Sequence, residues 1–522
     1  MTILTHPRGN PETAHAFREG IREPYWLKKI LPPSFPKLGK DASADILIVG
    51  AGITGATAAY FLSKAGKNVI LVDAGEAGGG ETSHTTAHLT AVLDGLEEIF
   101  RINGREKTQA VVRSHLEAID DIESIAAREN IECGFERVDG CLFQEAADSP
   151  EKLHGLLALW QEAGLRDTGW TDASPLGEGP ALRIGGQAQF HPVLYMHGLL
   201  SASGARIYSH TPVQKIEKGG VITKDGRPIR APQILIATHS PLKNILFFLK
   251  EAAYRSYVVA AKISKGAVPH RLYWDTADPY HYVRLAQADE HSDMLIVGGE
   301  DHKTGQSKNY KKPFRALESW MRQKFPSAGA LEYSWSGQIL EPVDGLAFIG
   351  RSPHSDNGLF LATGYSGNGM TYGTIAGKLL SELVLGKNPY LAKIFDPGRT
   401  SLGSAARFLE ENANAVARFV TGRLPEKNPE AKTVRSPEDL APDEGAVIQK
   451  GLNHWAVYRD ALGKIHASSA LCPHLGCIVQ WNEAEKTFDC PCHGSRFGKE
   501  GNVLNGPAER DLKPVRRTQS GD

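Results

Sequence analysis

Residues 44–73 of the chain read ADILIVGAGITGATAAYFLSKAGKNVILVD. The apolar runs Ile46–Val49 and Val69–Val72 are typical of short parallel strands that are buried on both faces. The segment between them predicts a helix from about Thr54 to Ala65, which Gly66 ends. The stretch therefore predicts a strand, a glycine-rich turn, a helix and a second parallel strand.

Three glycines, Gly50, Gly52 and Gly55, form a Gly-x-Gly-x-x-Gly turn before the helix. The first permits a tight turn, the second lets the backbone approach a pyrophosphate, and the third lets the helix pack on the strand. The helix N-terminus offers N–H groups to phosphate oxygens, and Asp73 ends the second strand, where a carboxylate can bind ribose hydroxyls. Together these features predict a dinucleotide site, but they do not distinguish NAD from FAD.

The length and charge of the chain limit the classes of protein to which it can belong. A length of 522 residues corresponds to about three domains. The net charge of -1 gives no electrostatic indication of a nucleic acid or an anionic membrane as partner. No apolar run reaches the ~18 residues of a membrane span, and residues 1–44 lack the apolar segment of a secretory signal. We therefore expect a cytoplasmic protein without a nucleic-acid partner or a transmembrane segment.

Residues 344–385 contain a second strand, glycine turn and helix. Gly364, Gly367 and Gly369 leave room for a ligand, and the helix from about Met370 directs its N-terminus at the same space. Two such turns, far apart in the sequence, indicate a long, buried cofactor that is held at both ends. They favour FAD over an exchanging NAD.

Residues 254–300 alternate aromatic and β-branched residues, a pattern that favours a large antiparallel sheet. Side chains of this region could line a substrate pocket, and an arginine could bind a carboxylate through two hydrogen bonds. The candidates for substrate contacts are Arg255, Tyr280, Tyr282, Arg284 and Tyr365. For the residues of the sheet, the alternative is a polar side chain that simply faces water.

Four motifs make residues 45–386 resemble the D-amino-acid-oxidase-like FAD-dependent oxidoreductases. They are IVGAGITG (48–55), VDAGEAGGG (72–80), PVDGLAFIG (342–350) and ATGYSGNGM (362–370). The resemblance implies oxidation of the C–N bond of an amine or an amino acid, such as glycine or sarcosine. It also implies FAD contacts at Gly50, Ala51, Gly52, Thr54, Gly55, Asp73, Ala74, Thr82, Val213, Gly367, Asn368, Gly369 and Met370.

Two histidines follow the second strand, in the threonine-rich turn after VDAGEAGGG. Some members of the resembled family attach the flavin covalently through a histidine near this turn, so His84 and His88 are candidates for such a link. The alternative, which we favour for both, is ordinary hydrogen bonding or exposure to solvent. The chain carries Ala87-His88 where the family usually has a glycine-rich end of the turn.

A cluster of four cysteines near the C-terminus forms two short boxes, CPHLGC (472–477) and CPCHGS (490–495). Each box supplies one Cys and one His, as in Rieske [2Fe–2S] centres, where two thiolates bind one iron and two imidazoles the other. Zinc is the alternative, but the ligand spacing of zinc fingers is absent. Residues 446–512 resemble Rieske domains. The resemblance implies the ligands Cys472, His474, Cys490 and His493 and a disulfide between Cys477 and Cys492.

Ser495, the last residue of the second box, and Phe497, two residues later, bear on the reduction potential of the cluster. Ser495 can donate a hydrogen bond to a cluster sulfur, which raises the potential. High-potential Rieske proteins carry a tyrosine two residues later, where this chain has Phe497. We therefore predict a somewhat lowered potential, still above that of plant-type ferredoxins. No mononuclear-iron domain accompanies the cluster, which argues against a ring-hydroxylating oxygenase.

The predicted fold is an α/β, Rossmann-like FAD-binding domain with an interleaved antiparallel-sheet substrate domain, plus a small all-β Rieske domain. The predicted divisions are an extension (1–44), the oxidoreductase (45–390), a helical connector and linker (391–436), and the Rieske domain (437–522). Within the oxidoreductase, FAD binding is assigned to about 45–100, 200–245 and 335–390, and substrate binding to about 101–199 and 246–334. A helix at 402–419 and a domain boundary near 425–437 belong to the connector.

The sequence thus predicts an FAD-dependent oxidoreductase that oxidises a small amine or amino acid. Electrons would pass from FAD to the cluster and then to an external acceptor. One alternative is an electron-transfer or redox-sensing protein without a dedicated amine substrate, and another is an oxidase that uses O2. Catalysis would require mainly orientation of the C–H bond over the flavin in a dry pocket. No essential base is evident from the sequence.

Overall fold

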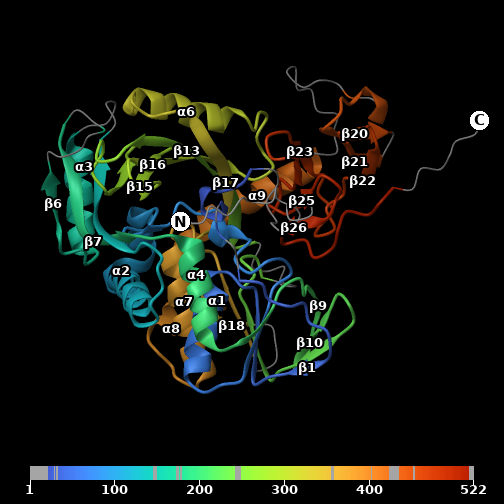
Figure 1. Cartoon of the computed structure of the whole chain (residues 1–522), viewed down its shortest axis with the longest axis horizontal. Helices are drawn as coiled ribbons and strands as arrows, with labels where there is room; N and C mark the ends of the chain where they lie inside the picture. Colours follow the sequence, from blue (N-terminus) through green and yellow to red (C-terminus); the bar gives the residue numbers. More distant parts are fainter. Residues whose placement is uncertain are drawn as a thin grey trace, which may run out of the picture.

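The computed structural model describes residues 22–515, except 29, 31–32, 145–149, 172–175, 177–178, 242–248, 354–357, 401, 422–433, 435 and 451–452. Figure 1 shows the oxidoreductase body, with the Rieske domain (orange to red) against one side of it. Most of the predicted boundary near 425–437 lies outside the described residues. The division of the chain into domains therefore stays a prediction.

The predicted nucleotide-binding sheet has six strands, and the opening stretch lies at its centre. The strands, in spatial order, are β18 (Phe348–Arg351), β19 (Leu359–Thr363), β12 (Gln233–Ile236), β2 (Ile46–Val49), β3 (Val69–Val72) and β8 (Arg206–Tyr208). All neighbours pair in parallel except β18 and β19. Strands β2 and β3 are fully buried, as their uninterrupted apolar runs predict.

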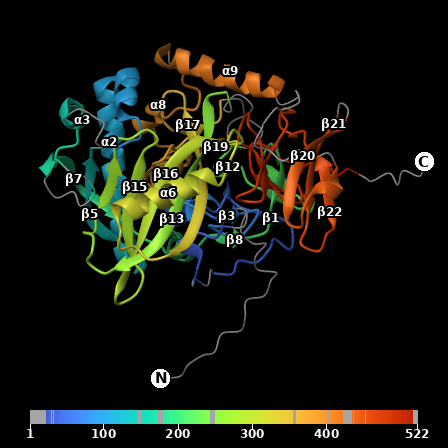
Figure 2. The same ribbon diagram turned by 90° about the horizontal axis from the view of Figure 1, so that it is seen from above.

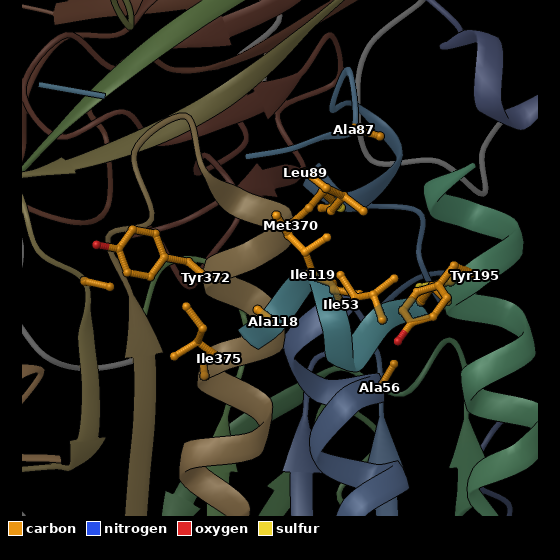
Figure 3. Close-up of a cluster of buried hydrophobic side chains, with 14 of the residues drawn as sticks. Ile53, Ala56, Ala87, Leu89, Ala118, Ile119, Tyr195, Met370, Tyr372 and Ile375 are labelled. Atoms are coloured by element: carbon orange, nitrogen blue, oxygen red, sulfur yellow. The ribbon is translucent and has the colours of Figure 1, made fainter. Parts of the chain in front are cut away.

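Four helices form the core beside this sheet: α1 (Ile53–Lys64), α2 (Leu96–Arg128), α4 (Pro192–Ser203) and α7 (Gly369–Val384). Figure 3 shows Ile53 of α1, Ile119 of α2, Tyr195 of α4 and Ile375 of α7 in one apolar cluster. Helices α1 and α7 can approach closely because Gly377 has no side chain. A Cβ on Gly377 would lie only 2.5 Å from the Thr57 Cβ. This contact holds the two predicted glycine turns together.

The second large sheet is the predicted substrate sheet, and it has nine strands. They are β17 (Leu331–Pro342), β13 (Glu251–Ser264), β16 (Ser292–Lys303), β15 (His281–Gln287), β14 (Leu272–Asp275), β5 (Glu136–Phe143), β7 (Ala181–Gln189) and β4 (His88–Leu89), with β6 (Thr168–Thr171) beside β7. Strands β14 and β5 pair in parallel and the other neighbours are antiparallel. Helix α6 (Lys312–Lys324) lies above this sheet in Figure 1, and α3 (Pro150–Glu162) lies near β6 and β7.

The described part of the predicted extension packs against the oxidoreductase. Trp26, in a short turn at Tyr25–Leu27, is 1% exposed, and its Nε1 donates to the Thr85 carbonyl oxygen at 2.6 Å. Strand β1 (Ala42–Ser43) joins a small side sheet with β11 (Pro228–Arg230), β10 (Gly220–Thr223) and β9 (Val213–Glu217). The sequence did not indicate this packing, because a single buried tryptophan has no periodic pattern.

The C-terminal domain is all β, as predicted, and consists of two small antiparallel sheets. One contains β20 (Glu444–Lys450), β21 (Asn453–Arg459) and β22 (Ile465–Ser469), and the other β23 (Gln480–Asn482), β24 (Thr487–Asp489), β25 (Arg496–Gly498) and β26 (Val503–Asn505). Helix α9 (Ala405–Thr421) lies between this domain and the body in Figure 1 and along one edge of the molecule in Figure 2. None of the helices in the described part of the chain is long and apolar enough to cross a membrane.

Candidate functional site

The first glycine turn has the geometry that a dinucleotide requires. Gly50 has φ +107, and a Cβ there would overlap the carbonyl oxygen of Ala237 on the neighbouring strand end. A Cβ on Gly55 would overlap the carbonyl oxygen of Gly50, so α1 can begin this close to β2 only with glycine. The N–H of Ile53 donates to Thr82 Oγ1 at 3.0 Å, which ties the predicted hydroxyl turn to the start of α1.

Asp73 lies where a ribose-binding carboxylate is expected. Its Oδ2 accepts from the Ala51 N–H and its Oδ1 from the Gly75 N–H, both at 2.8 Å. These bonds fix the carboxylate between two loops, and a carboxylate oxygen can accept more than one hydrogen bond. Asp73 also lines the large cavity described next. The turn and this carboxylate therefore fit the pyrophosphate and ribose of FAD.

A cavity of about 2050 Å³ runs between the two glycine turns. This volume exceeds the roughly 300–1,000 Å³ of typical ligand pockets, so there is room for a dinucleotide and a substrate. Among the predicted FAD contacts, those that line it are Gly50, Gly52, Thr54, Asp73, Ala74, Thr82, Val213, Gly367, Asn368, Gly369 and Met370. Ala51 and Gly55 lie behind its wall, where they shape the turn.

The second glycine turn is held by the side chain of Asn368, at the start of α7. Its Oδ1 accepts from the Asp94 N–H at 3.1 Å, and its Nδ2 donates to the Val92 carbonyl oxygen at 3.2 Å. The Tyr365 hydroxyl lies 2.9 Å from Thr54 Oγ1 of α1. The two turns are thus joined at the cavity wall by polar contacts as well as by the packing of α1 on α7.

Two of the predicted substrate contacts, Tyr280 and Tyr282, line the cavity at the nine-stranded sheet. The Tyr282 hydroxyl lies 2.7 Å from Ser256 Oγ, and the Tyr280 hydroxyl donates to Asp301 Oδ2 at 3.5 Å. Burial raises the pKa of both phenols, so they are neutral hydrogen-bonding groups at physiological pH. Tyr365 also lines the cavity, near the second glycine turn.

The two arginines considered for a carboxylate clamp lie elsewhere. Arg284 is buried, and its Nη1 donates to the carbonyl oxygens of Thr86, Ala87 and Phe190 at 2.8–3.1 Å. Burial lowers its pKa to about 9. Arg255 points to the Rieske domain, where its Nη2 lies 2.8 Å from a carboxylate oxygen of Glu485. Neither arginine borders the cavity, so the structure does not place a guanidinium from these strands at the substrate position.

Asp94 borders the cavity and was not indicated by the sequence. Its carboxylate accepts from the Gly367 N–H, and it interacts electrostatically with both tyrosines, Tyr280 and Tyr282. Burial, and then the nearby charge of Glu341, raise its pKa to about 6. The only signal in the sequence was a lone carboxylate in a loop, which is not a motif. The structure identifies it as a titratable group that borders the cavity beside Gly367, at the second glycine turn.

His84 and His88 both line the cavity and both have hydrogen-bonding neighbours. His84 Nδ1 lies 3.0 Å from Ser83 Oγ, and His88 Nδ1 lies 3.1 Å from Thr86 Oγ1. Burial and the charge of Arg284 lower the pKa of His88 to about 3, so its imidazole is neutral. The choice between hydrogen bonding and a covalent flavin link stays a prediction.

The two predicted cluster boxes meet in space. Cys472 and Cys490 are each 1% exposed, and their thiols are hydrogen-bonded to each other. The rings of His474 and His493 lie edge to face with centroids 5.0 Å apart. Burial lowers the pKa of both histidines to about 4, which gives the neutral imidazole that binds metal. Two thiols and two neutral imidazoles in one place fit a Rieske cluster.

A disulfide joins the two boxes through Cys477 and Cys492, whose Cα atoms are 6.5 Å apart. The sulfurs of these two residues and of Cys490 lie within 4.8 Å of one another, but the disulfide removes two of them as metal ligands. The Ser495 hydroxyl is hydrogen-bonded to Cys472, and its role as a donor to a cluster sulfur stays a prediction. Phe497 is fully buried where high-potential relatives have tyrosine.

The Rieske domain completes the wall of the same cavity. Lys499, Asn505 and Gly506 line it together with Asp73 and Val213. Residues predicted for FAD and residues that follow the cluster boxes therefore face one continuous space.

The profile of a family described as "FAD dependent oxidoreductase" matches residues 45–383, which is more than half of the chain. The chain belongs to this FAD-dependent oxidoreductase family. A second profile, the Rieske [2Fe-2S] domain, matches residues 430–516. The family assignment confirms the predicted fold class and both predicted cofactors, FAD and a [2Fe–2S] cluster.

Individual proteins resemble this FAD-dependent oxidoreductase over the whole chain, over its oxidoreductase part or over its Rieske part. A Bacillus subtilis (strain 168) protein named as a Rieske 2Fe-2S iron-sulfur protein, YhfW, is 34% identical over 511 residues, 96% of this chain and 98% of its own. The structure of glycine oxidase from Geobacillus kaustophilus matches with a TM-score of 0.58 and 19% identity, over 69% of this chain and 99% of its own. The cytochrome b6-f complex iron-sulfur subunit of Synechococcus sp. (strain JA-3-3Ab) is 42% identical over 86 residues, 16% of this chain and 41% of its own.

Proposed function

We propose that the protein oxidises the C–N bond of a small amine or amino acid and passes the electrons through the Rieske cluster to an external acceptor. The observation that carries this proposal is the single cavity that joins the FAD turns, the Asp94 end and the Rieske domain. When bound, FAD supplies the acceptor for a hydride. Glycine oxidase and an L-proline dehydrogenase are among the proteins of similar fold, which supports the substrate class.

Asp94 can hold the proton that amine oxidation must release. A protonated amine is a poor hydride donor, because its nitrogen lone pair is not available to stabilise the developing carbon–nitrogen double bond. The Asp94 carboxylate borders the cavity, and its pKa of about 6 lets it accept a proton near neutral pH. Tyr280 and Tyr282 would orient the substrate from the opposite sheet. All three remain proposed contacts.

The cations that line the cavity bear on whether the substrate could carry a carboxylate group. Among the described residues, the arginines that line the cavity are Arg22 and Arg510. Arg22 Nε donates to the Ala484 carbonyl oxygen of the Rieske domain at 3.1 Å, and Arg510 belongs to that domain. Lysines that could bind a carboxylate also line the cavity: Lys152, Lys215, Lys224, Lys486 and Lys499. The proposed substrate class therefore stays an amine or an amino acid, and the Asp94 carboxylate would attract the ammonium group of either.

An anaerobic titration tests the proposal. The purified protein with both cofactors is mixed with secondary amines, tertiary amines and amino acids, while flavin bleaching and the EPR signal of the reduced cluster are followed. We expect an amine to bleach the flavin and to produce the cluster signal. Bleaching without the cluster signal would exclude the relay, and fast reoxidation by O2 alone would favour an oxidase. No bleaching by any compound would favour an electron-transfer or redox-sensing protein.

The variant His493→Ala separates the two cofactors in the same titration. It removes one predicted cluster ligand, so the Rieske signal should disappear while FAD stays bound and is still bleached by the amine. Loss of FAD together with the cluster would contradict the proposed division of the chain into an oxidoreductase and a Rieske domain.

A further inference from the structure

The loop that carries Cys490 and His493 rests on strand β17 through one side chain. Gln338 Nε2 donates to the carbonyl oxygen of Gly494 at 2.7 Å. Gln338 is 3% exposed and lines the cofactor cavity. It therefore links the residue next to a proposed cluster ligand directly to the cavity wall.

The backbone of Gln338 makes a second contact, toward the turn beside the first glycine loop. Its N–H donates to Glu81 Oε2 at 2.7 Å. Thr82, the residue after Glu81, accepts from the Ile53 N–H at the start of α1. A continuous series of hydrogen bonds and covalent bonds thus runs from Gly494 through Gln338 to the proposed phosphate-binding end of α1.

Glu81 also binds a second loop of the Rieske domain, which contains Asn505 and Ala508. Its Oε1 accepts from Asn505 Nδ2 at 2.9 Å. In the same loop, the Ala508 N–H donates to Ser495 Oγ at 3.0 Å. The Glu81 carboxylate therefore connects to both Rieske loops. It binds the loop of Asn505 directly, and it binds the loop of Gly494 through Gln338.

The backbones approach closely at this contact. Gly494 has φ +78, and a Cβ there would overlap Ala253 of β13 and lie 2.6 Å from Gln338 Nε2. A Cβ on Gly305 would lie 2.7 Å from the Pro491 nitrogen. The loop backbone thus lies directly on the body, without an intervening layer of side chains.

We propose that Gln338 is the positioning residue that holds the cluster-binding loop against the cofactor-binding turn, and that electrons cross between FAD and the cluster through this contact. The inference rests on the proposed function, in which the cluster takes electrons from FAD. In each transfer the reduced cofactor loses one electron and the oxidised cluster gains it. A one-electron acceptor then reoxidises the cluster, and two transfers return FAD to its oxidised form while the proton of the hydride leaves to water.

Gln306 provides a matched control for Gln338. Its Nε2 donates to the carbonyl oxygen of Pro491, in the same loop, at 2.9 Å. It belongs to the opposite side of the loop, where its Oε1 accepts from Arg418 of α9 at 3.2 Å. Both glutamines therefore donate to the loop, but only Gln338 connects it to the cofactor turn.

The experiment reduces the bound flavin with light and EDTA without air, so that no amine is needed, and follows the EPR signal of the reduced cluster by rapid freezing. Gln338→Leu should slow the appearance of that signal by about tenfold or more, because a displaced partner reacts far more slowly. Gln306→Leu should keep the wild-type rate. In both variants, the FAD content and the g-values of the cluster should match the wild type, and amide exchange in the ligand loop should rise.

Gln338→Glu gives a readout that loss of packing cannot reproduce. A protonated carboxyl group can donate to the Gly494 carbonyl oxygen, whereas the ionised form can only accept. The transfer rate of Gln338→Glu should therefore approach that of the wild type at low pH and fall as the carboxyl group ionises. The Gln338→Leu rate should not show this added pH dependence.

The outcomes separate the two proposals. If the wild-type flavin, once reduced, transfers no electron to the cluster, the relay in the proposed function is wrong. If the wild type transfers electrons but Gln338→Leu keeps its rate, or Gln306→Leu slows it equally, the role of Gln338 is overturned. A pH-independent rate in Gln338→Glu would also overturn it.

Discussion

The Asp94 carboxylate accepts from the Gly367 N–H and borders the cavity. Asp94→Asn keeps the shape of the side chain but removes its ability to take up a proton. We expect this change to slow flavin reduction by an amine by about 10²–10⁴-fold, the usual contribution of a general base. Anaerobic stopped-flow absorbance of the flavin would measure the rate, with saturating amine.

The rate of flavin reduction should depend on pH through the protonation of Asp94. Burial raises the pKa of Asp94 to about 6, so the carboxylate form needed to accept a proton is lost as the pH falls below that value. The wild-type rate should decline on that acidic side, and Asp94→Asn should lack this decline. Glu97→Gln, which removes another carboxylate from the cavity rim, is the control. A wild-type profile in Asp94→Asn would exclude Asp94 as the base.

For single residues, the sequence allowed a prediction only where the proposed role follows from the spacing of neighbouring residues in the chain. The glycines of the turns, Asp73 and the Cys and His boxes each act beside their sequence neighbours. Arg284 and Asp94 show where such reasoning stops. Arg284 Nη1 donates to carbonyl oxygens from two other segments, and the pKa of Asp94 is raised first by burial and then by the charge of Glu341, far away in the chain. No local pattern encodes those neighbours.

At the scale of the element, the start of α1 depends on the absence of a side chain at Gly55. Gly55→Ala would place a Cβ into the carbonyl oxygen of Gly50, so the helix must shift away from β2. Overpacking of this kind costs about 1–3 kcal/mol and would distort the proposed pyrophosphate site. We expect a lower melting temperature and loss of FAD from the purified protein, measured by calorimetry and by flavin absorbance.

Gly155 is the matched control, because it is also a glycine inside a helix. A Cβ on Gly155, in α3, would meet no atom within 4 Å. Gly155→Ala should raise the stability of the protein by roughly 0.5–1 kcal/mol, since alanine favours the helix, and should leave FAD bound. Equal retention of FAD in both variants would contradict the proposed role of the first glycine turn.

The elements were predictable to the extent that one strand or helix carries its own pattern. The strands at Ile46–Val49 and Val69–Val72 lie where their apolar runs place them. The parallel pairing of β14 with β5 was not predictable, because it joins residues that are far apart in sequence. The packing of the Arg284 guanidinium over the Trp26 ring was not predictable either. It is a tertiary contact, and the segment of Trp26 has no periodic apolar residues.

At the scale of the whole molecule, a buried group of charges joins the Rieske domain to the oxidoreductase. The Glu485 carboxylate, 2% exposed, lies 2.8 Å from Arg255 Nη2 of β13 and 3.2 Å from Arg496 Nη2 of β25. It also accepts from Ser336 Oγ of β17 at 2.5 Å. This carboxylate therefore pairs with two buried guanidinium groups, one from each part of the chain, and Arg496 pairs also with the buried Asp489 at 3.1 Å. The sequence could not reveal this pairing, since Arg255 and Glu485 belong to separate predicted domains.

Replacing Glu485 by Gln would remove the buried charge partner of Arg255, whereas Arg496 would keep its buried pair with Asp489. Breaking a buried pair in this way costs about 3–5 kcal/mol, so the contact between the two parts should weaken strongly. Heating should then bleach the cluster absorbance at a lower temperature, before FAD is released. Asp289→Asn breaks the exposed pair with Lys262 and should cost less than about 1 kcal/mol. If both variants melt alike, the charges at this interface contribute little, and the Rieske domain is held mainly by its loop contacts.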